Sequence, residues 1–221
     1  MVRRRKLARR YANRTVAGRA LGEALLEQAT PQKPIVLALP RGGVPVAVEV
    51  AARLGAALGV ILVRKIGVPG RSELAMGALA MVGGQLSEFR NEEIVDGLGI
   101  PDQAFEAARS REQLELQRRA SVFPPDDLDV ADATVILVDD GLATGSTMLA
   151  ATAAVRGLSP AAVVVAVPVG ARQAVQALGA VADLVVCLSS PEPFIAVGGA
   201  YEDFRQLSDE EVVAILNEFA N

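Results

Sequence analysis

Short apolar runs alternate along this chain with alanine-rich stretches of helical spacing, and this alternation constrains the fold more than any other feature. Such a pattern is typical of βαβ units built around a parallel sheet. The apolar runs show no alternation of apolar and polar residues, as expected for strands that helices cover on both faces. The sequence therefore predicts an α/β fold with a parallel sheet flanked by helices. The predicted strands are residues 35–39, 60–64, 134–138, 162–167 and 184–188, and the predicted helices are residues 16–28, 44–58, 101–119, 146–157, 171–178 and 209–219.

One long segment between the second and third predicted strands departs from the βαβ pattern. Its first part, "IGVPGRSELAMGALAMVGG" at 66–84, is rich in glycine and contains a Pro-Gly pair, which predicts a loop and allows a hairpin. The stretch "FPPDDLD" at 123–129 is predicted to be a linker. With 221 residues, of which 51% are hydrophobic, the chain can bury a full core, and we expect a single domain over residues 1–221.

The absence of histidine from the sequence excludes several kinds of chemistry. Ser-His-Asp and Cys-His nucleophile systems, imidazole general bases and histidine-bound zinc cannot occur in this chain. The single cysteine, Cys187, cannot form an internal disulfide, and its place in the apolar run "ADLVVCL" indicates a small buried thiol without a chemical role. Carboxylates, lysine, tyrosine or the substrate itself must therefore move any protons.

The charge of the chain limits its expected partners. A net charge of -4 and a pI near 5.1 argue against a nucleic-acid partner, although the chain begins with "RRRKLARR" at 3–10, which we interpret as a solvated arm. No apolar core of signal-peptide length follows this arm, and no run approaches the roughly 20 apolar residues that span a bilayer. We therefore expect a soluble, cytoplasmic protein without a membrane partner.

The stretch "VILVDDGLATGST" at 135–147 carries the clearest functional pattern. Asp139 and Asp140 follow a predicted strand, which places two carboxylates at the carboxyl edge of the sheet, where open α/β sheets bind ligands. Carboxylates would repel a phosphate, but they suit sugar hydroxyls or a divalent cation. Residues 144–147 then supply a glycine and hydroxyls at the start of a helix, where free backbone N–H groups bind anions. Together these features predict a site for ribose 5-phosphate, with the diol on the carboxylates and the phosphate on the loop.

The alternative interpretation is that Asp139 and Asp140 only end a strand and that Ser146 only caps a helix. The order of strand, acidic pair, loop and helix favours the ligand site. The motif is not a Walker A loop, because no Gly-Lys-Ser/Thr sequence occurs, and no Gly-x-Gly-x-x-Gly follows a strand as in dinucleotide sites. A hydrolase is disfavoured because Ser146 has neither a Gly-x-Ser-x-Gly elbow nor a histidine partner.

In this stretch the chain resembles type I phosphoribosyltransferases, whose phosphoribosyl-pyrophosphate (PRPP) binding motif is similar to "VILVDDGLATGST". The segments "NRTVAGRALGEAL", "VLALPRGGVPVAVEVA", "VRKIGVPGRSELAMGALA" and "YEDFRQLSDEEV" are similar to those of a bacterial subfamily whose base substrate is undefined. The resemblance implies the type I fold, with a small hood from roughly residues 1–30 and 189–221 and a mobile loop. It also implies transfer of the 5-phosphoribosyl group from PRPP to a nitrogenous base, with release of pyrophosphate.

The resemblance further implies which residues bind PRPP. A loop after the first core strand, here "LPRGG", would hold pyrophosphate, often through a non-proline cis peptide. In that loop Arg41 supplies charge, while Gly42 and Gly43 expose N–H groups. Lys65, at the end of the next predicted strand, would be a second pyrophosphate contact. The expected PRPP-binding set is Arg41, Gly42, Gly43, Lys65, Asp139, Asp140, Gly141, Leu142, Ala143, Thr144, Gly145, Ser146 and Thr147.

The residues expected to take part in catalysis are Asp139, Asp140 and Arg71. Mg²⁺ would be held mainly by pyrophosphate and ribose oxygens, with Asp139 or Asp140 as a metal ligand directly or through water. Arg71 and Glu73 lie where the family has a mobile loop that closes over the reacting centre and keeps out water, and Arg71 would meet the leaving pyrophosphate. For each basic side chain named here, an ordinary solvated position is the alternative.

The aromatic residues indicate where the acceptor base would bind. The chain has six Phe, two Tyr and no Trp, yet Phe194, Tyr201 and Phe204 fall in one short segment after the last predicted strand. In the family this region covers the acceptor, so we expect Tyr201 to stack on the base and Phe204 to pack in a small core. Ala143 stands where the 6-oxopurine branch has an aspartate, which disfavours hypoxanthine and guanine and leaves no general base assigned.

A non-catalytic regulator of the same fold, which senses PRPP or a nucleotide, is the alternative function. Pyrophosphate release would separate the enzyme from the regulator. The expected partners are PRPP and a small nitrogenous acceptor, the expected cofactor is Mg²⁺, and the resemblance allows a homodimer.

Overall fold

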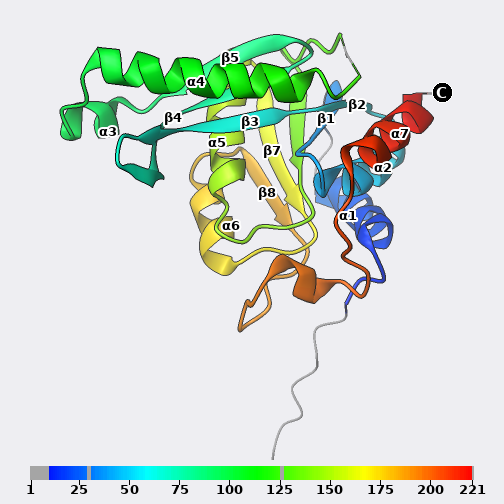
Figure 1. The fold of residues 1–221 in the computed structure, drawn as a ribbon. Helices are drawn as coiled ribbons and strands as arrows, with labels where there is room; N and C mark the ends of the chain where they lie inside the picture. The colour runs from blue at the N-terminus through cyan, green and yellow to red at the C-terminus, as the bar shows by residue number, and fades with distance from the viewer. Residues whose placement is uncertain (1–9, 29–30, 125–126, 221) are drawn as a thin grey trace, which may run out of the picture.

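The computed structural model describes residues 10–28, 31–124 and 127–220. Most of the predicted basic arm at 3–10 and part of the predicted linker at 123–129 therefore lie outside the described residues. Figure 1 shows a parallel sheet flanked by helices, with a second sheet packed beside it. The predicted α/β fold with a helix-flanked parallel sheet is confirmed.

The main sheet has five parallel strands in the order β2-β1-β6-β7-β8. Four of the predicted strands lie in it, because apolar runs of this length are stable only when both faces are covered. The neighbours β1 and β6 end level with each other, so the loops that follow them share one edge of the sheet. The strands are β1 (Pro34–Ala38), β2 (Ala57–Val60), β6 (Thr134–Val138), β7 (Ala162–Val167) and β8 (Leu184–Cys187).

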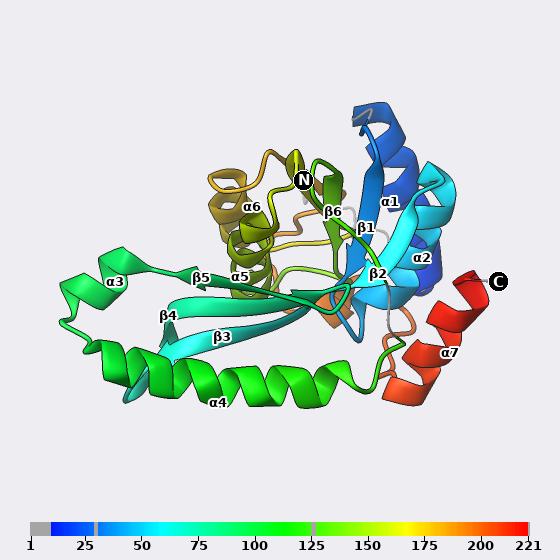
Figure 2. The same cartoon turned by 90° about the horizontal axis from the view of Figure 1, so that it is seen from above.

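Helices cover both faces of the main sheet, as Figure 2 shows from above. On β1, the side chains of Val36 and Ala38 pack with the helices of one face, and Leu37 packs with the helices of the other. This alternation follows from the two-residue period of a strand. One face carries α1 (Arg14–Gln28), α2 (Gly43–Leu54) and α7 (Asp209–Ala220), and the other carries α5 (Ser146–Val155) and α6 (Arg172–Gly179).

The second sheet is antiparallel, in the order β3-β4-β5. It lies between α4 and α5, with Leu79 of β4 in the cluster on the α4 side and Ala78 and Ala80 in the cluster on the α5 side. The small alanine side chains let α5 approach the sheet closely. This unit consists of β3 (Leu62–Val68), β4 (Arg71–Val82), β5 (Gln85–Arg90), α3 (Glu92–Gly97) and α4 (Asp102–Ala120).

Two predictions about this region were wrong. The predicted strand at 60–64 is two strands in different sheets, because the chain leaves the main sheet after Ile61, whose N–H still donates to the Ala38 carbonyl at 3.0 Å. The predicted loop at 66–84 is mostly β-strand, although the hairpin is present. Its glycines mark tight turns, since Gly70, Gly83 and Gly84 all have positive φ.

Helix α2 is shorter than predicted, and it packs very closely on α1. It ends at Leu54 because Gly55 takes a left-handed conformation with φ of 60°, which stops the helix. On α1, a Cβ atom at Gly18 would lie 2.6 Å from the carbonyl oxygen of Val46, and a Cβ atom at Gly22 would lie 2.9 Å from the side chain of Arg53. The two glycines therefore permit a close contact between the helices.

Segments from the two ends of the chain meet beside the main sheet. The N–H of Tyr11 donates to the Ala200 carbonyl at 2.8 Å, and the N–H of Glu202 donates to the Tyr11 carbonyl at 2.8 Å. Figure 1 shows the start of α1 next to the segment that leads to α7. The 3-10 turn η2 (Val197–Ala200) precedes this contact. Parts of both segments of the expected hood thus lie together.

Candidate active site

The acidic pair lies at the carboxyl edge of the main sheet, as predicted. Asp139 and Asp140 directly follow β6 and are half-buried. The Oδ1 atom of Asp139 accepts a hydrogen bond of 2.8 Å from the backbone N–H of Asp140. The loop between β1 and α2 reaches the same edge because β1 is the neighbour of β6.

The loop between β1 and α2 packs directly on the acidic pair. A Cβ atom at Gly42 would lie 2.0 Å from Oδ2 of Asp140, and a Cβ atom at Gly43 would lie 2.6 Å from a carbonyl oxygen of β6. Any side chain at these positions would displace the loop or the carboxylate. The peptide bond between Pro40 and Arg41 is cis, as the family resemblance implied.

The same loop presents polar groups to the space beyond the sheet edge. Its internal backbone hydrogen bonds use the N–H groups of Gly43 and Val44. In the described part of the chain, the N–H groups of Arg41 and Gly42 donate to no backbone carbonyl. The Arg41 side chain is half-buried, with Nε 3.9 Å from a carboxylate oxygen of Asp209 in α7. This loop can therefore offer an anion both N–H groups and a guanidinium.

The loop between the acidic pair and α5 is anchored at Leu142. The Leu142 side chain is buried. Its backbone N–H donates to the Val169 carbonyl at 2.9 Å, and its backbone carbonyl accepts from the Ala171 N–H at 2.8 Å. Gly141 also has no room for a side chain, because a Cβ atom there would lie 2.6 Å from Val197. These contacts fix the position of the loop relative to the segment that follows β7.

The loop ends at the N-terminus of α5, where Gly145 has a φ of 74° that favours glycine. The first N–H groups of an α-helix have no acceptor within the helix, so they are available to an anion. The hydroxyl of Thr144 is 3.1 Å from that of Ser146 and accepts a 3.4 Å hydrogen bond from the Ser146 N–H. Thr144 and Thr147 are exposed at this helix start, as is Ala143 in the loop before it. The predicted phosphate loop is thus brought together beside the acidic pair.

Arg14 is a site residue that was not predicted from the sequence. It is 9% exposed, and its Nε and Nη2 atoms each lie 2.8 Å from Oδ2 of Asp140. The available signal was its helical spacing from Ala17, Gly18 and Leu21, which places Arg14 on the buried face of α1. A charged residue on that face calls for a partner of opposite charge.

Burial and mutual repulsion shape the electrostatics of the acidic pair. Burial raises the pKa of Asp139 well above the usual aspartate value, and the neighbouring Asp140 raises it further. Burial also raises the pKa of Asp140, but the charge of Arg14 and its hydrogen bond act in the opposite direction. The two carboxylates are therefore unequal, because Arg14 forms an ion pair with Asp140 and acts on Asp139 only through its charge.

The base-stacking role predicted for Tyr201 is wrong for this structure, because the ring is 2% exposed. Its hydroxyl donates a 2.6 Å hydrogen bond to the Asp140 carbonyl, and its ring stacks on Phe204 at 5.1 Å. Burial raises the pKa of Tyr201, which remains a neutral donor. The predicted packing of Phe204 in a small core is confirmed, since it packs against the buried cluster that contains Tyr201. The guanidinium of Arg14 lies over its ring, 4.0 Å from the centroid.

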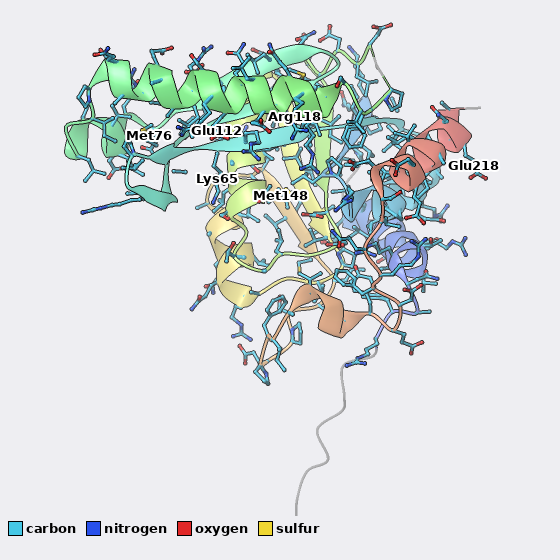
Figure 3. All side chains as sticks on the ribbon, viewed as in Figure 1. Lys65, Met76, Glu112, Arg118, Met148 and Glu218 are labelled. Atoms are coloured by element: carbon cyan, nitrogen blue, oxygen red, sulfur yellow. The ribbon has the colours of Figure 1, made fainter. Side chains whose placement is uncertain are left out.

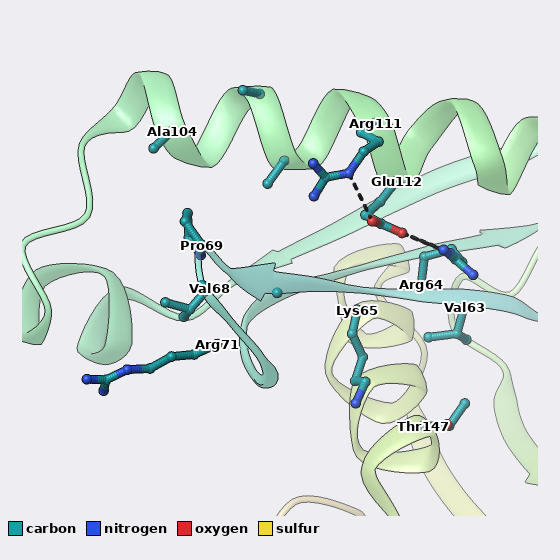
Figure 4. A pocket seen from close by; sticks show the side chains of 14 residues that line it. Val63, Arg64, Lys65, Val68, Pro69, Arg71, Ala104, Arg111, Glu112 and Thr147 are labelled. Atoms are coloured by element: carbon teal, nitrogen blue, oxygen red, sulfur yellow. Dashed lines mark hydrogen bonds and ion pairs between the residues drawn. The ribbon is translucent and has the colours of Figure 1, made fainter.

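Lys65 lies in the middle of β3 in the second sheet, not at the end of a main-sheet strand as predicted. Its side chain nevertheless extends toward the N-terminus of α5, near Met148 in Figure 3 and Thr147 in Figure 4. Its neighbour Arg64 points to the opposite side, where it pairs with Glu112 of α4 at 2.8 Å. The strand alternation thus directs Lys65 to the site and Arg64 to the helix.

A cavity of about 1030 Å³ lies along β3, between the hairpin, α4 and the start of α5. Most charged side chains in its lining are basic, and they include Lys65, Arg71 and Arg111. Arg71 is exposed at the first residue of β4, and in Figure 4 it points away from Lys65. The side chain of Glu73 lies outside the described residues. The space is large enough for a small anionic ligand.

The carboxylates fit a magnesium ion only in part. Among the described residues there is no group of three or more Cys, Asp or Glu that could hold a metal. Mg²⁺ commonly binds through one or two carboxylates together with substrate phosphates and water. Asp139 and Asp140 match that partial set of oxygen ligands.

A parallel sheet with an acidic pair and a glycine-containing loop before a helix at its carboxyl edge is the arrangement of type I phosphoribosyltransferase folds. A family model described as "Phosphoribosyl transferase domain" matches residues 12–201, and the chain belongs to this family. The crystal structure of TT1426 from Thermus thermophilus is similar, with a TM-score of 0.83 and 44% identity, and the match covers 96% of this chain and 100% of that one.

Two curated proteins of Mycobacterium tuberculosis, from the strains CDC 1551 / Oshkosh and ATCC 25618 / H37Rv, are also similar. Both are provisionally named phosphoribosyl transferases and are 43% identical over 209 residues, which is 94% of this chain. The chain spans 46% of the length of these relatives. Within the described residues, none of the helices is long and apolar enough to cross a membrane.

Proposed function

We propose that this protein transfers the 5-phosphoribosyl group of PRPP to a nitrogen atom of a heterocyclic base and releases pyrophosphate. The observation that carries the proposal is the single connection from β6 to α5, which presents the acidic pair and then the helix-start N–H groups. A vicinal diol needs acceptors, and a phosphate needs donors. The connection presents the acceptors first and the donors second, and ribose 5-phosphate likewise carries its diol at one end and its phosphate at the other.

Each part of PRPP has a proposed place in the site. The 5-phosphate binds the loop at 141–147, and the ribose hydroxyls bind Asp139 and Asp140. The pyrophosphate binds the N–H groups of Arg41 and Gly42 on one side and Lys65 on the other. Arg71 closes over it when the hairpin moves toward the loop. This assignment leaves the aromatic hood segment for the acceptor.

In the proposed reaction the nitrogen lone pair forms a bond to the anomeric carbon as the bond to the pyrophosphate oxygen breaks. Positive charge develops on the ribose ring, and the carboxylates beside it stabilise that charge. The cations of the pyrophosphate site stabilise the charge that collects on the leaving group. A closed hairpin would exclude water, which would otherwise capture the ribosyl group.

Magnesium is the proposed cofactor, and when bound it would neutralise part of the pyrophosphate charge and help that group to leave. Asp139 is the carboxylate better placed to help hold it, because Asp140 is already paired with Arg14. The proposed cellular location remains the cytoplasm, and a homodimer remains a prediction.

The acceptor is proposed to bind against the hood segment near Phe194 and Ile195 instead of Tyr201. Ile195 is 89% exposed and Phe194 is partly buried, so both have surface available in this segment. Ala143 offers no carboxylate to a purine ring, so hypoxanthine and guanine remain disfavoured.

The test is a panel of free purine, pyrimidine and pyridine bases, each incubated with PRPP and Mg²⁺ and assayed for pyrophosphate. Base-dependent release is expected for at least one acceptor, and omission of the base is the control. Tight PRPP binding by calorimetry without release for any base would identify a PRPP-sensing regulator instead. Absence of both PRPP binding and release would refute the proposal.

A further inference from the structure

Arg14 joins the acidic pair to the hood. Its Nη1 atom donates to the carbonyl of Arg205 at 3.0 Å, and its guanidinium lies over the ring of Phe204, 4.0 Å from the centroid. Tyr201, which stacks on Phe204, donates to the carbonyl of Asp140. Asp140 is therefore held at its side chain by Arg14 and at its backbone by Tyr201.

The ion pair leaves a specific part of each carboxylate open. Both Arg14 nitrogens meet the same oxygen, Oδ2 of Asp140, and Oδ1 of Asp139 accepts the Asp140 N–H. For the described residues, no further hydrogen bond reaches Oδ1 of Asp140 or Oδ2 of Asp139. One oxygen from each carboxylate thus has no hydrogen-bond partner among the described residues, and two such acceptors on consecutive residues match in number the two hydroxyls of a vicinal diol.

The position of Asp140 is also limited by the loop between β1 and α2. The same Oδ2 atom that Arg14 contacts lies so close to Gly42 that a Cβ atom there would be 2.0 Å away. The guanidinium of Arg14 and the backbone of this loop therefore both restrict the carboxylate. Without Arg14 the carboxylate would lose the contact that sets its orientation, while Asp139 and the loop would keep theirs.

We propose that Arg14 is a positioning residue that fixes Asp140 for the ribose diol, so that ligands with a ribose need Arg14 and pyrophosphate does not. The proposal rests on the assignment of the acidic pair to ribose under the proposed function. The competing interpretation is that Arg14 only stabilises the fold, which would affect all ligands alike.

Calorimetric titrations of PRPP, ribose 5-phosphate and pyrophosphate with Mg²⁺ test the proposal on the whole chain. Arg14→Gln is expected to weaken PRPP and ribose 5-phosphate by about 10- to 100-fold, the usual range for a charge-assisted hydrogen bond, and to change pyrophosphate affinity less than about twofold. Arg14→Lys should restore part of the lost affinity. The matched control is Arg19→Gln on the next turn of α1, whose ion pair with Glu49 at 2.9 Å is exposed.

If Arg14→Gln does not fold, Phe204→Leu provides the second variant, because it removes the ring that holds the guanidinium flat. It should give the same ligand pattern with a smaller loss. Equal losses for all three ligands, or unchanged ribose 5-phosphate affinity, would overturn the role of Arg14. Failure of the wild-type chain to bind any of the three ligands would instead overturn the proposed function.

Discussion

Asp139 and Asp140 are adjacent in sequence, but their substitution by asparagine should change stability in opposite directions. Asp140→Asn should lower the free energy of unfolding by about 2 to 3 kcal/mol, because Arg14 would keep a buried charge without an anionic partner. Asp139→Asn should fold at least as stably as the wild type, because it removes a carboxylate that burial disfavours in its charged form. Urea denaturation at pH 7 measures both values. Equal changes in the two variants would contradict this division.

The raised pKa of Asp139 also predicts a sign for the pH dependence. The folded chain holds this proton more tightly than the unfolded chain, so the contribution of Asp139 to wild-type stability should fall as the pH rises above 3.8, the usual aspartate value. Asp139→Asn lacks that contribution. Its stability relative to the wild type should therefore increase with pH over this range, and a constant or decreasing difference would refute the argument.

Gly145 is required by both its backbone angle and its neighbours. Gly145→Val should weaken ribose 5-phosphate by at least about 100-fold and spare pyrophosphate, because φ of 74° and a contact of 3.0 Å to Ala174 exclude a side chain without moving the loop. Gly99→Val is the control for backbone strain alone, since Gly99 has a φ of 61° and open space around it. Calorimetry with both ligands would expose a wrong assignment if pyrophosphate were lost as well.

Lys65 lies on β3 of the second sheet, but it is proposed to bind pyrophosphate at the edge of the main sheet. Lys65→Ala and Arg41→Ala should each weaken pyrophosphate and PRPP by about tenfold and spare nucleoside monophosphates, which have no pyrophosphate to bind. Lys33→Ala, a lysine just before β1 at the amino edge of the main sheet, is the matched control. Similar losses for nucleoside monophosphates would place these side chains elsewhere.

At the scale of elements, the contact between α1 and α2 depends on glycine. Gly18→Ala should lower the free energy of unfolding by about 1 to 3 kcal/mol, although alanine favours helices, because its Cβ would meet a carbonyl oxygen at 2.6 Å. Gly97→Ala, at the end of α3 with nothing nearby, should be neutral or slightly stabilising. Thermal melts compare the stability of the two variants. Equal changes in melting temperature would mean that α1 and α2 can move apart without loss of stability.

The two sheets differ in how well the sequence predicts them, and the difference is physical. Strands β6 and β7 are buried on both faces, so runs of Val, Ile, Leu and Ala identify them in the sequence. Strand β4 instead presents Gly77, Ala78 and Ala80 to its helices, and these residues have low β-propensity. A well-formed sheet with such small side chains looks like a flexible loop in the sequence.

For the site as a whole, local patterns were predictable and distant contacts were not. The acidic pair, the phosphate loop and the cis peptide lie in contiguous motifs. The partner of Asp140 is 126 residues away, and no local pattern links Arg14 to it. The role of Tyr201 was predicted wrongly for the same reason. Its hydroxyl donates to the Asp140 carbonyl, and only the tertiary fold brings these two groups together.

The contacts that hold Asp140 have a consequence for the order in which the chain folds during synthesis. Asp140 is contacted by Arg14, which is synthesised before it, and by Tyr201, which is synthesised 61 residues after it. Arg205 in turn accepts a hydrogen bond from Arg14. A nascent chain that has emerged as far as β8 can pair every strand of both sheets, yet it still lacks the residues that hold Arg14 in place. Folding on the ribosome would thus allow the strands to pair first, and the proposed ribose site would be complete only after residue 205 leaves the exit tunnel.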